Sequence, residues 1–292
     1  MKGKRFSVFD ALNVLVMLAL VLITLFPFLH VVAKAFSGTG KVVAGLVTFY
    51  PRDIQFDSLR FVLRDHVFLN SLGVSVMVTV LGTLGAMLLT VLTAYPLSKP
   101  GWRGRRAVLL LYVFVMLFNG GIVPNYLLYT SLKLTNTVFA LLLPPLLSVY
   151  NMLIVKNYME SLPESVEEAA LIDGASQLRL LVSIILPMSM PVLATVGLFY
   201  AVGYWNDYFS AMLYVTRQAI KPLQLYLYEL VKQSINLVDS MGNLINMDAA
   251  MNISGESVRS ATVLVATLPI LIVYPFLQKH FVKGIMIGSV KG

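Results

Sequence analysis

The chain contains no cysteine, and few of its residues are charged. Charged residues make up 12% of its 292 residues, whereas a soluble domain usually has about 25%. Without cysteine there can be no disulfide framework, thiolate metal site or cysteine nucleophile. The three histidines, His30, His66 and His280, lie in separate segments, and neither an H-E-x-x-H nor a G-x-S-x-G motif is present. These absences argue against an enzyme.

One segment has only part of a nucleotide-binding loop. Residues 40 and 41 form the Gly-Lys pair of a Walker A sequence. However, Ala35 stands where the first glycine of that motif should be, and Val42 stands where serine or threonine should follow. The chain therefore has no Walker A motif of its own.

Apolar residues are abundant and make up 58% of the chain. They form long stretches without Asp, Glu, Lys or Arg, and a helix needs about 20 such residues to cross a bilayer. Six stretches qualify: residues 11–33, 67–98, 107–132, 134–155, 180–206 and 260–278. The sequence therefore predicts an all-α membrane protein with six transmembrane helices.

Basic residues lie in short segments that flank these stretches, which is their usual place in a membrane protein. The net charge of +8 is therefore not an indication of nucleic-acid binding. If all six stretches span, the basic segments fall on one side, and the positive-inside rule makes that side cytoplasmic. Both termini would then be cytoplasmic, and the loops at residues 34–66 and 215–258 would face outward. The segments contain Lys2, Lys4 and Arg5; Lys99, Arg103, Arg105 and Arg106; and Lys279, Lys283 and Lys291.

The loop between the fourth and fifth stretches is acidic, although its place in the topology predicts a basic one. Ser161 followed by Glu164 fits a capping box, and Gly174 suits a helix C-terminus. We therefore expect a short helix at about residues 162–173, then a turn and a second helix that runs toward Pro187. Such a short helix is marginal alone in water, so it must pack on something, and a partner protein is a natural candidate.

Glu168-Ala169-Ala170, Gly174, Ile184, Leu186 and Pro187 have the full spacing of a known motif. The segment at residues 160–187 resembles the EAA loop of permeases from binding-protein-dependent ABC importers. The resemblance implies a type I ABC importer permease fold, in which the short helix is a cytoplasmic coupling helix that docks on an ATPase. The docking residues would be Glu164, Glu167, Glu168, Ala169, Ala170, Asp173 and Gly174. Either Glu167 or Glu168 would pair with a basic residue of the ATPase.

Other segments resemble the carbohydrate branch of this family. They are residues 9–13, Pro27-Phe28, Asn119-Gly120-Gly121, Trp205-Asn206 and residues 283–292. Within that branch they resemble the maltose-type second permease for complex oligosaccharides, including alginate importers. This implies a cytoplasmic N-terminal segment, first helix and outer loop at 1–66, a five-helix permease core at 67–280, and a cytoplasmic tail at 281–292.

The resemblance also implies partners and a location. The chain would be a multi-pass protein of the bacterial plasma (inner) membrane, in contact with lipid, that imports oligosaccharides by alternating access. It would work with a second homologous permease, two ATPase subunits and a periplasmic or extracytoplasmic sugar-binding protein, and without nucleic acid. ATP and Mg would be used by the ATPase subunits, while this chain would bind no cofactor or metal.

Asn119, Asn206 and Asp207 are candidates for the substrate path, because polar and ionisable groups in a membrane are costly and often functional. Asp207 fits a helix cap equally well. On a continuous helix Tyr204 and Tyr208 would share a packing face, while Asn206 would face the path.

Two alternative functions are open at this point. An ion-coupled secondary transporter would need an ionisable residue at mid-membrane, but Asp207 lies near the end of its span. An intramembrane enzyme lacks recognisable catalytic motifs.

Overall fold

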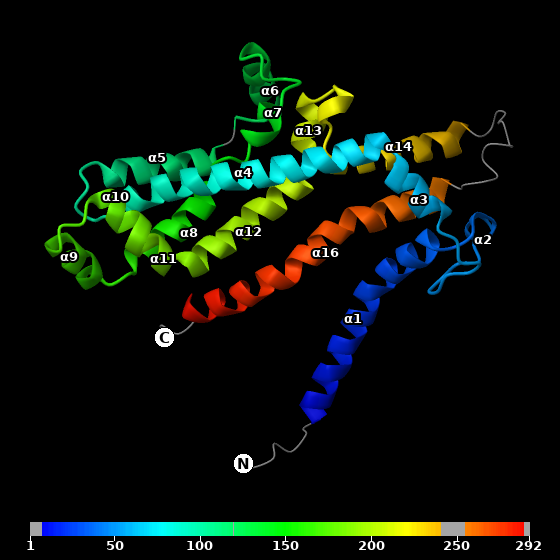
Figure 1. Cartoon of the computed structure of the whole chain (residues 1–292), viewed down its shortest axis with the longest axis horizontal. Coiled ribbons are helices and arrows are strands. Elements are labelled where there is room, and N and C mark those ends of the chain that lie inside the picture. Colours follow the sequence, from blue (N-terminus) through cyan, green and yellow to red (C-terminus); the bar gives the residue numbers. More distant parts are fainter. Residues whose placement is uncertain (1–7, 119, 241–254, 289–292) are drawn as a thin grey trace. The chain divides into compact units, whose positions relative to one another are not determined.

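The computed structural model describes the backbone of residues 8–118, 120–240 and 255–288, and the side chains of residues 9–118, 120–232 and 255–272. Within these ranges the chain is helical, with one isolated antiparallel bridge between Ser37 and Ile54. The all-α prediction is confirmed (Figure 1). The helices are α1 (Val8–Ala35), α2 (Thr39–Val43), α3 (Asp57–Arg64), α4 (His66–Ser98), α5 (Arg105–Leu117), α6 (Ile122–Ser131), α7 (Phe139–Leu142), α8 (Val149–Glu160), α9 (Glu164–Ile172), α10 (Gln177–Leu180), α11 (Leu186–Met188), α12 (Met190–Asn206), α13 (Phe209–Tyr214), α14 (Leu223–Ser240) and α16 (Gly255–Gly288).

Three helices among the described residues are long and apolar enough to cross a membrane: Phe9–Ala35, His66–Ser98 and Gly255–Ile272. Two bent pairs raise the number to as many as five. Helix α5 is bent by 110° from α6, and the segment Gln177–Met188 is bent by 81° from α12. Pro187 and Pro191 flank the second bend at Ser189, and proline interrupts helical hydrogen bonding.

The predicted stretch at residues 134–155 is not one helix. It forms α7 and the first part of α8, separated by an irregular segment that contains Pro144 and Pro145. Proline lacks the backbone N–H that continues a helix and disfavours helical geometry in the residue before it. The loop expected at residues 215–258 is also partly helical, because α14 extends to Ser240.

The chain divides into two compact units, residues 1–69 with 227–269 and residues 70–226 with 270–292. The division predicted from the sequence, at residues 66 and 280, stays a prediction. In the first unit α1 is apolar all around and its spanning window has no buried residue, so it requires lipid or another protein around it. A small core of Ala33, Val42 and Val47 joins the last turn of α1 to the segment that follows it.

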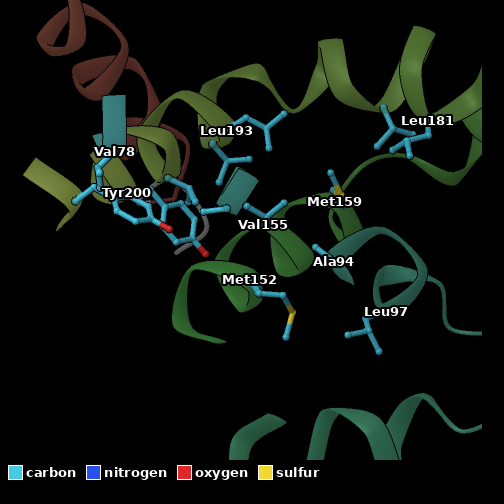
Figure 2. Packing of buried hydrophobic residues seen from close by; sticks show 14 of the residues in the cluster. Val78, Ala94, Leu97, Met152, Val155, Met159, Leu181, Leu193 and Tyr200 are labelled. Carbon is cyan, nitrogen blue, oxygen red and sulfur yellow. The ribbon is translucent and has the colours of Figure 1, made fainter. Parts of the chain in front are cut away.

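The main hydrophobic core lies in the second unit, where α4, α8 and α12 contribute most of the buried side chains (Figure 2). Tyr204 packs so closely on α4 that a Cβ atom at Gly82 would lie 2.5 Å from the tyrosine ring. The Tyr204 hydroxyl donates to the Leu142 carbonyl at 2.8 Å. These contacts hold α12 against α4 and against the end of α7.

Candidate functional site

The acidic loop forms a helical corner at one end of the second unit (Figure 1). Helix α9 ends in a turn in which the Gly174 N–H donates to the Leu171 carbonyl, and the Ala175 N–H donates to the Ala170 carbonyl, both at 3.0 Å. Gly174 has φ +79°, a left-handed conformation that glycine adopts without a steric penalty. The predicted glycine cap is confirmed, and so is the second helical segment, which runs to Met188.

The capping box predicted at the other end of α9 is wrong. Ser161 is the C-cap of α8, and its hydroxyl donates to the Tyr158 carbonyl at 2.7 Å. Helix α9 begins only at Glu164, after Pro163, which gives it no side-chain cap. The first turn still contains Glu164 and Glu167, where negative charge is favoured by the helix dipole.

Only one face of α9 packs against the chain. Ala170 is buried and Val166 is half-buried, whereas Glu164, Glu168 and Ala169 are exposed. Asp173 and Gly174, in the turn that follows, are exposed as well. The docking residues predicted from the sequence thus divide into an inward and an outward set.

Two large apolar residues on the outward surface were missed by the sequence reasoning. Ile172 is 85% exposed and Leu178, just after the turn, is 70% exposed. At 100° per residue, Ile172 lies about 40° from Glu168 and far from Val166 and Ala170. The sequence could have indicated this exposed apolar surface, because it places an isoleucine on the polar face of a short helix. A carboxylate, a small residue and exposed apolar side chains together are typical of a surface that another protein covers.

The two candidate carboxylates have different surroundings. Glu167 forms an ion pair with Lys99, just after α4, and both side chains are partly buried. Glu168 is exposed and forms no ion pair with any other described residue. Of the two, Glu168 is therefore the carboxylate that is available to a partner.

A second group of ion pairs lies where α8 ends. Glu160 pairs with Lys156 one turn earlier and with Arg105 Nη2 at 2.5 Å. The hydrogen bond from Lys156 holds the pKa of Glu160 below its usual value, and the hydrogen bond from Arg105 acts in the same direction, although partial burial opposes both. The basic residues of the loop after α4 therefore fasten the acidic loop as well as flanking a span.

Two of the candidates for the substrate path, Asn206 and Asp207, lie at the end of α12 that is farther from this corner. Asn206 is exposed at the end of α12, a helix of 17 residues or roughly 25 Å. The Asp207 carboxylate accepts a hydrogen bond from the Ser210 N–H at 3.0 Å, so it caps the start of α13. Asn119 lies outside the described residues.

The expectation that Tyr204 and Tyr208 share one helix face is wrong in part. Tyr204 is buried against α4 as expected. Helix α12 ends at Asn206, so Tyr208 lies beyond it, and its side chain is 41% exposed. The backbone turns at Asp207, whose ψ of 101° is extended rather than helical.

Comparison with known proteins identifies the family. The profile of the binding-protein-dependent transport system inner membrane component matches residues 86–287, a range that includes the whole helical corner. The chain belongs to this family of permeases. The sequence resemblance and the predicted fold class are thereby confirmed, and the ion-coupled secondary transporter receives no support.

Relatives extend the similarity over the whole permease. Protein LplC of Bacillus subtilis is 41% identical over 99% of this chain and 97% of its own. The polygalacturonan/rhamnogalacturonan transport system permease YtcP of the same species is 40% identical over 97% of this chain and 98% of its own. A chain in the crystal structure of a bacterial ABC transporter that imports the acidic polysaccharide alginate is 32% identical, with a TM-score of 0.87 over 96% of this chain and 99% of that one.

Proposed function

We propose that the chain is the permease subunit of an ATP-driven ABC importer that takes up oligosaccharides, acidic ones among them, by alternating access. The observation that carries this proposal is the outward surface of the helical corner, where Glu168, Ala169 and Ile172 are exposed. In a permease of this family such a corner needs a partner at the membrane surface. A cytoplasmic ATPase fits, because a basic residue at its docking cleft would pair with Glu168 while its apolar side chains cover Ile172.

In the complete importer the chain would contact three kinds of partner protein and the lipid of the membrane. A second homologous permease completes the translocation path, two ATPase subunits bind the coupling helices, an extracytoplasmic sugar-binding protein delivers the substrate, and lipid surrounds α1. The ATPase subunits use ATP and Mg, and this chain itself binds no cofactor and performs no covalent chemistry. Asn206 offers both a donor and an acceptor to sugar hydroxyls in the path.

Two ion pairs support the proposed topology, that is, which loops lie on the same side of the bacterial inner membrane. Lys99 and Glu167 join two loops that were both predicted to be cytoplasmic. Lys34 and Glu256 join the two loops that were predicted to face outward. Each pair connects loops predicted to lie on the same side, which agrees with the predicted topology, while the choice of the cytoplasmic side rests on the positive-inside rule.

The proposal that the substrate is acidic is supported mainly by the relatives. One structural relative belongs to an importer of an acidic polysaccharide, and the relative YtcP is named for galacturonan transport. The loop at residues 34–66, which was predicted to face outward, has exposed basic residues that suit an anionic ligand: Lys41, Arg52, Arg60 and Arg64. Acidic residues are interspersed among them, namely Asp53, Asp57 and Asp65. The basic residues are therefore a supporting observation only.

Reconstitution into proteoliposomes tests the function. The chain would be assembled with the second permease, ATPase and binding protein encoded by neighbouring genes. Uptake of labelled alginate and galacturonan oligosaccharides would be compared with uptake of a neutral malto-oligosaccharide. We expect ATP-dependent uptake that persists when ionophores collapse ion gradients, with preference for the acidic sugars. Uptake that needs no ATP and stops with ionophores would overturn the proposal in favour of an ion-coupled transporter.

A further inference from the structure

The C-terminal end of α4 holds the helical corner on both sides of its turn. Lys99, the residue after α4, pairs with Glu167 of α9. One turn earlier, the Tyr95 hydroxyl donates to Gln177 Oε1 at 3.1 Å, and Gln177 begins α10. The Lys99 Nζ also lies 4.8 Å from the centre of the Tyr95 ring, a cation–π distance. We call these four residues the α4 clamp.

A further contact fastens the entrance of the corner to the same end of α4. The Arg105 Nε donates to the Leu97 carbonyl in the last turn of α4 at 2.8 Å, while its Nη2 pairs with Glu160 at the end of α8. The entrance, the helix and the exit of the corner are therefore each tied to α4 or to the loop that follows it.

Polar contacts matter here because α9 has little apolar contact of its own. Ala170 is the only residue of α9 that is buried, and its side chain contributes a single methyl group to the packing. The side chains of Lys99 and Glu167 are 29% and 19% exposed, so water and salt screen this pair less than a fully exposed one. The position of α9 relative to α4 therefore depends strongly on the clamp.

Helix α4 in turn contacts the rest of the core. The Tyr200 hydroxyl of α12 lies 2.8 Å from Thr90 Oγ1 of α4. Farther along α4, the Tyr204 ring fills the space at Gly82. A displacement of α9 that moved the end of α4 would therefore reach α12 through side chains already in contact.

We propose that the α4 clamp transmits the movement of the coupling helix to α4, and that Lys99 and Glu167 are positioning residues for ATP-driven transport. Glu168 binds the ATPase from outside, whereas Glu167 holds the same helix from inside. This inference rests on the proposed function, because it assumes that α9 moves with an ATPase.

Sugar uptake per ATP hydrolysed by the reconstituted complex tests the clamp, with labelled alginate and galacturonan oligosaccharides as the probes. Lys99→Gln should lower this ratio roughly threefold or more, while membrane level and ATPase pull-down stay normal. Arg103→Gln is the matched control, because it makes the same charge change in the same loop at an exposed residue that forms no ion pair with other described residues.

Charge reversal separates coupling from mere stability. Lys99→Glu and Glu167→Lys should each lower the ratio, and the double variant, which restores an opposite-charge pair, should recover a large part of it. The clamp is overturned if Lys99→Gln behaves like Arg103→Gln, or if the double variant is no better than the single ones. Failure of the unmutated complex to take up any sugar with ATP would instead refute the proposed function, and the clamp with it.

Discussion

The Tyr200 hydroxyl of α12 takes part in two hydrogen bonds: it pairs with Thr90 Oγ1 of α4 at 2.8 Å, and it accepts from the Ser148 N–H at the start of α8 at 3.0 Å. One side chain thus joins three helices at the centre of the second unit. Thr90 is buried and Ser148 is half-buried, so the Thr90 hydroxyl could not turn to water if the Tyr200 hydroxyl were lost.

Tyr200→Phe should therefore lower the free energy of unfolding by about 1–3 kcal/mol, because it leaves the buried Thr90 hydroxyl and the half-buried Ser148 N–H without their partner. Thermal unfolding of the purified protein in detergent measures the effect. Tyr150→Phe is the control, since Tyr150 is 62% exposed, and it should leave the unfolding temperature nearly unchanged. Equal effects of the two variants would show that the Tyr200 hydroxyl contributes nothing to stability.

Gly82→Ala should destabilise the protein, because the new Cβ would lie 2.5 Å from the Tyr204 ring, closer than any real contact. Overpacking of this kind typically costs about 1–3 kcal/mol. Gly73→Ala on the same helix has no atom within 4 Å of the new Cβ. There the better helix propensity of alanine should stabilise by about 0.5–1 kcal/mol. Opposite signs for these two variants in the same melting assay are the expected result.

Glu168→Lys should weaken binding of the ATPase by at least tenfold, because like charges that face each other at an interface cost about 1.4 kcal/mol or more. Ile172→Asp should act similarly by placing a charge where apolar contact is expected. Pull-down of the ATPase and sugar-stimulated ATP hydrolysis provide the measurements, with the amount of permease in the membrane as the control. Normal pull-down for both variants would mean that the outward face of α9 does not bind the ATPase.

The contribution of Glu160 to stability should depend on pH. Its pKa is lowered in the folded protein from the reference value of 4.5, chiefly by the hydrogen bond from Lys156. A lowered pKa means that the contribution is present above about pH 4.5 and is lost as the pH falls through the lower folded value. Its size should be at most about 1 kcal/mol, because the side chain is 37% exposed and therefore screened.

Glu160→Gln tests this dependence. The difference in unfolding free energy between the unmutated protein and Glu160→Gln should be constant near neutral pH and should shrink below about pH 4.5. A difference that stays constant down to pH 3 would contradict the assigned ion pairs.

The local sequence was sufficient for several features of the permease. Long charge-free stretches predicted the all-α membrane fold, because a bilayer core leaves the backbone no hydrogen-bond partner except its own helix. Gly174 predicted the turn after α9, since the left-handed conformation there is a property of one residue. The spacing from Glu168 to Pro187 was sufficient to indicate the family, because such a motif is contained in a single continuous segment.

Only the folded structure decided which of several possible partners a polar side chain takes. Glu167 and Glu168 are neighbours with the same chemistry, and what separates them is Lys99, 68 residues away from Glu167. The sequence left two interpretations of Asp207 open, a helix cap and a polar group in the substrate path. In the structure α12 ends just before it, and its carboxylate accepts a hydrogen bond from the Ser210 N–H. Ser161 was assigned to the wrong helix because its hydroxyl can accept from a following N–H or donate to a preceding carbonyl, and in the structure it donates to the Tyr158 carbonyl at the end of α8. A sequence pattern records which groups can form a contact, whereas the folded chain determines which of the possible partners comes within hydrogen-bonding distance.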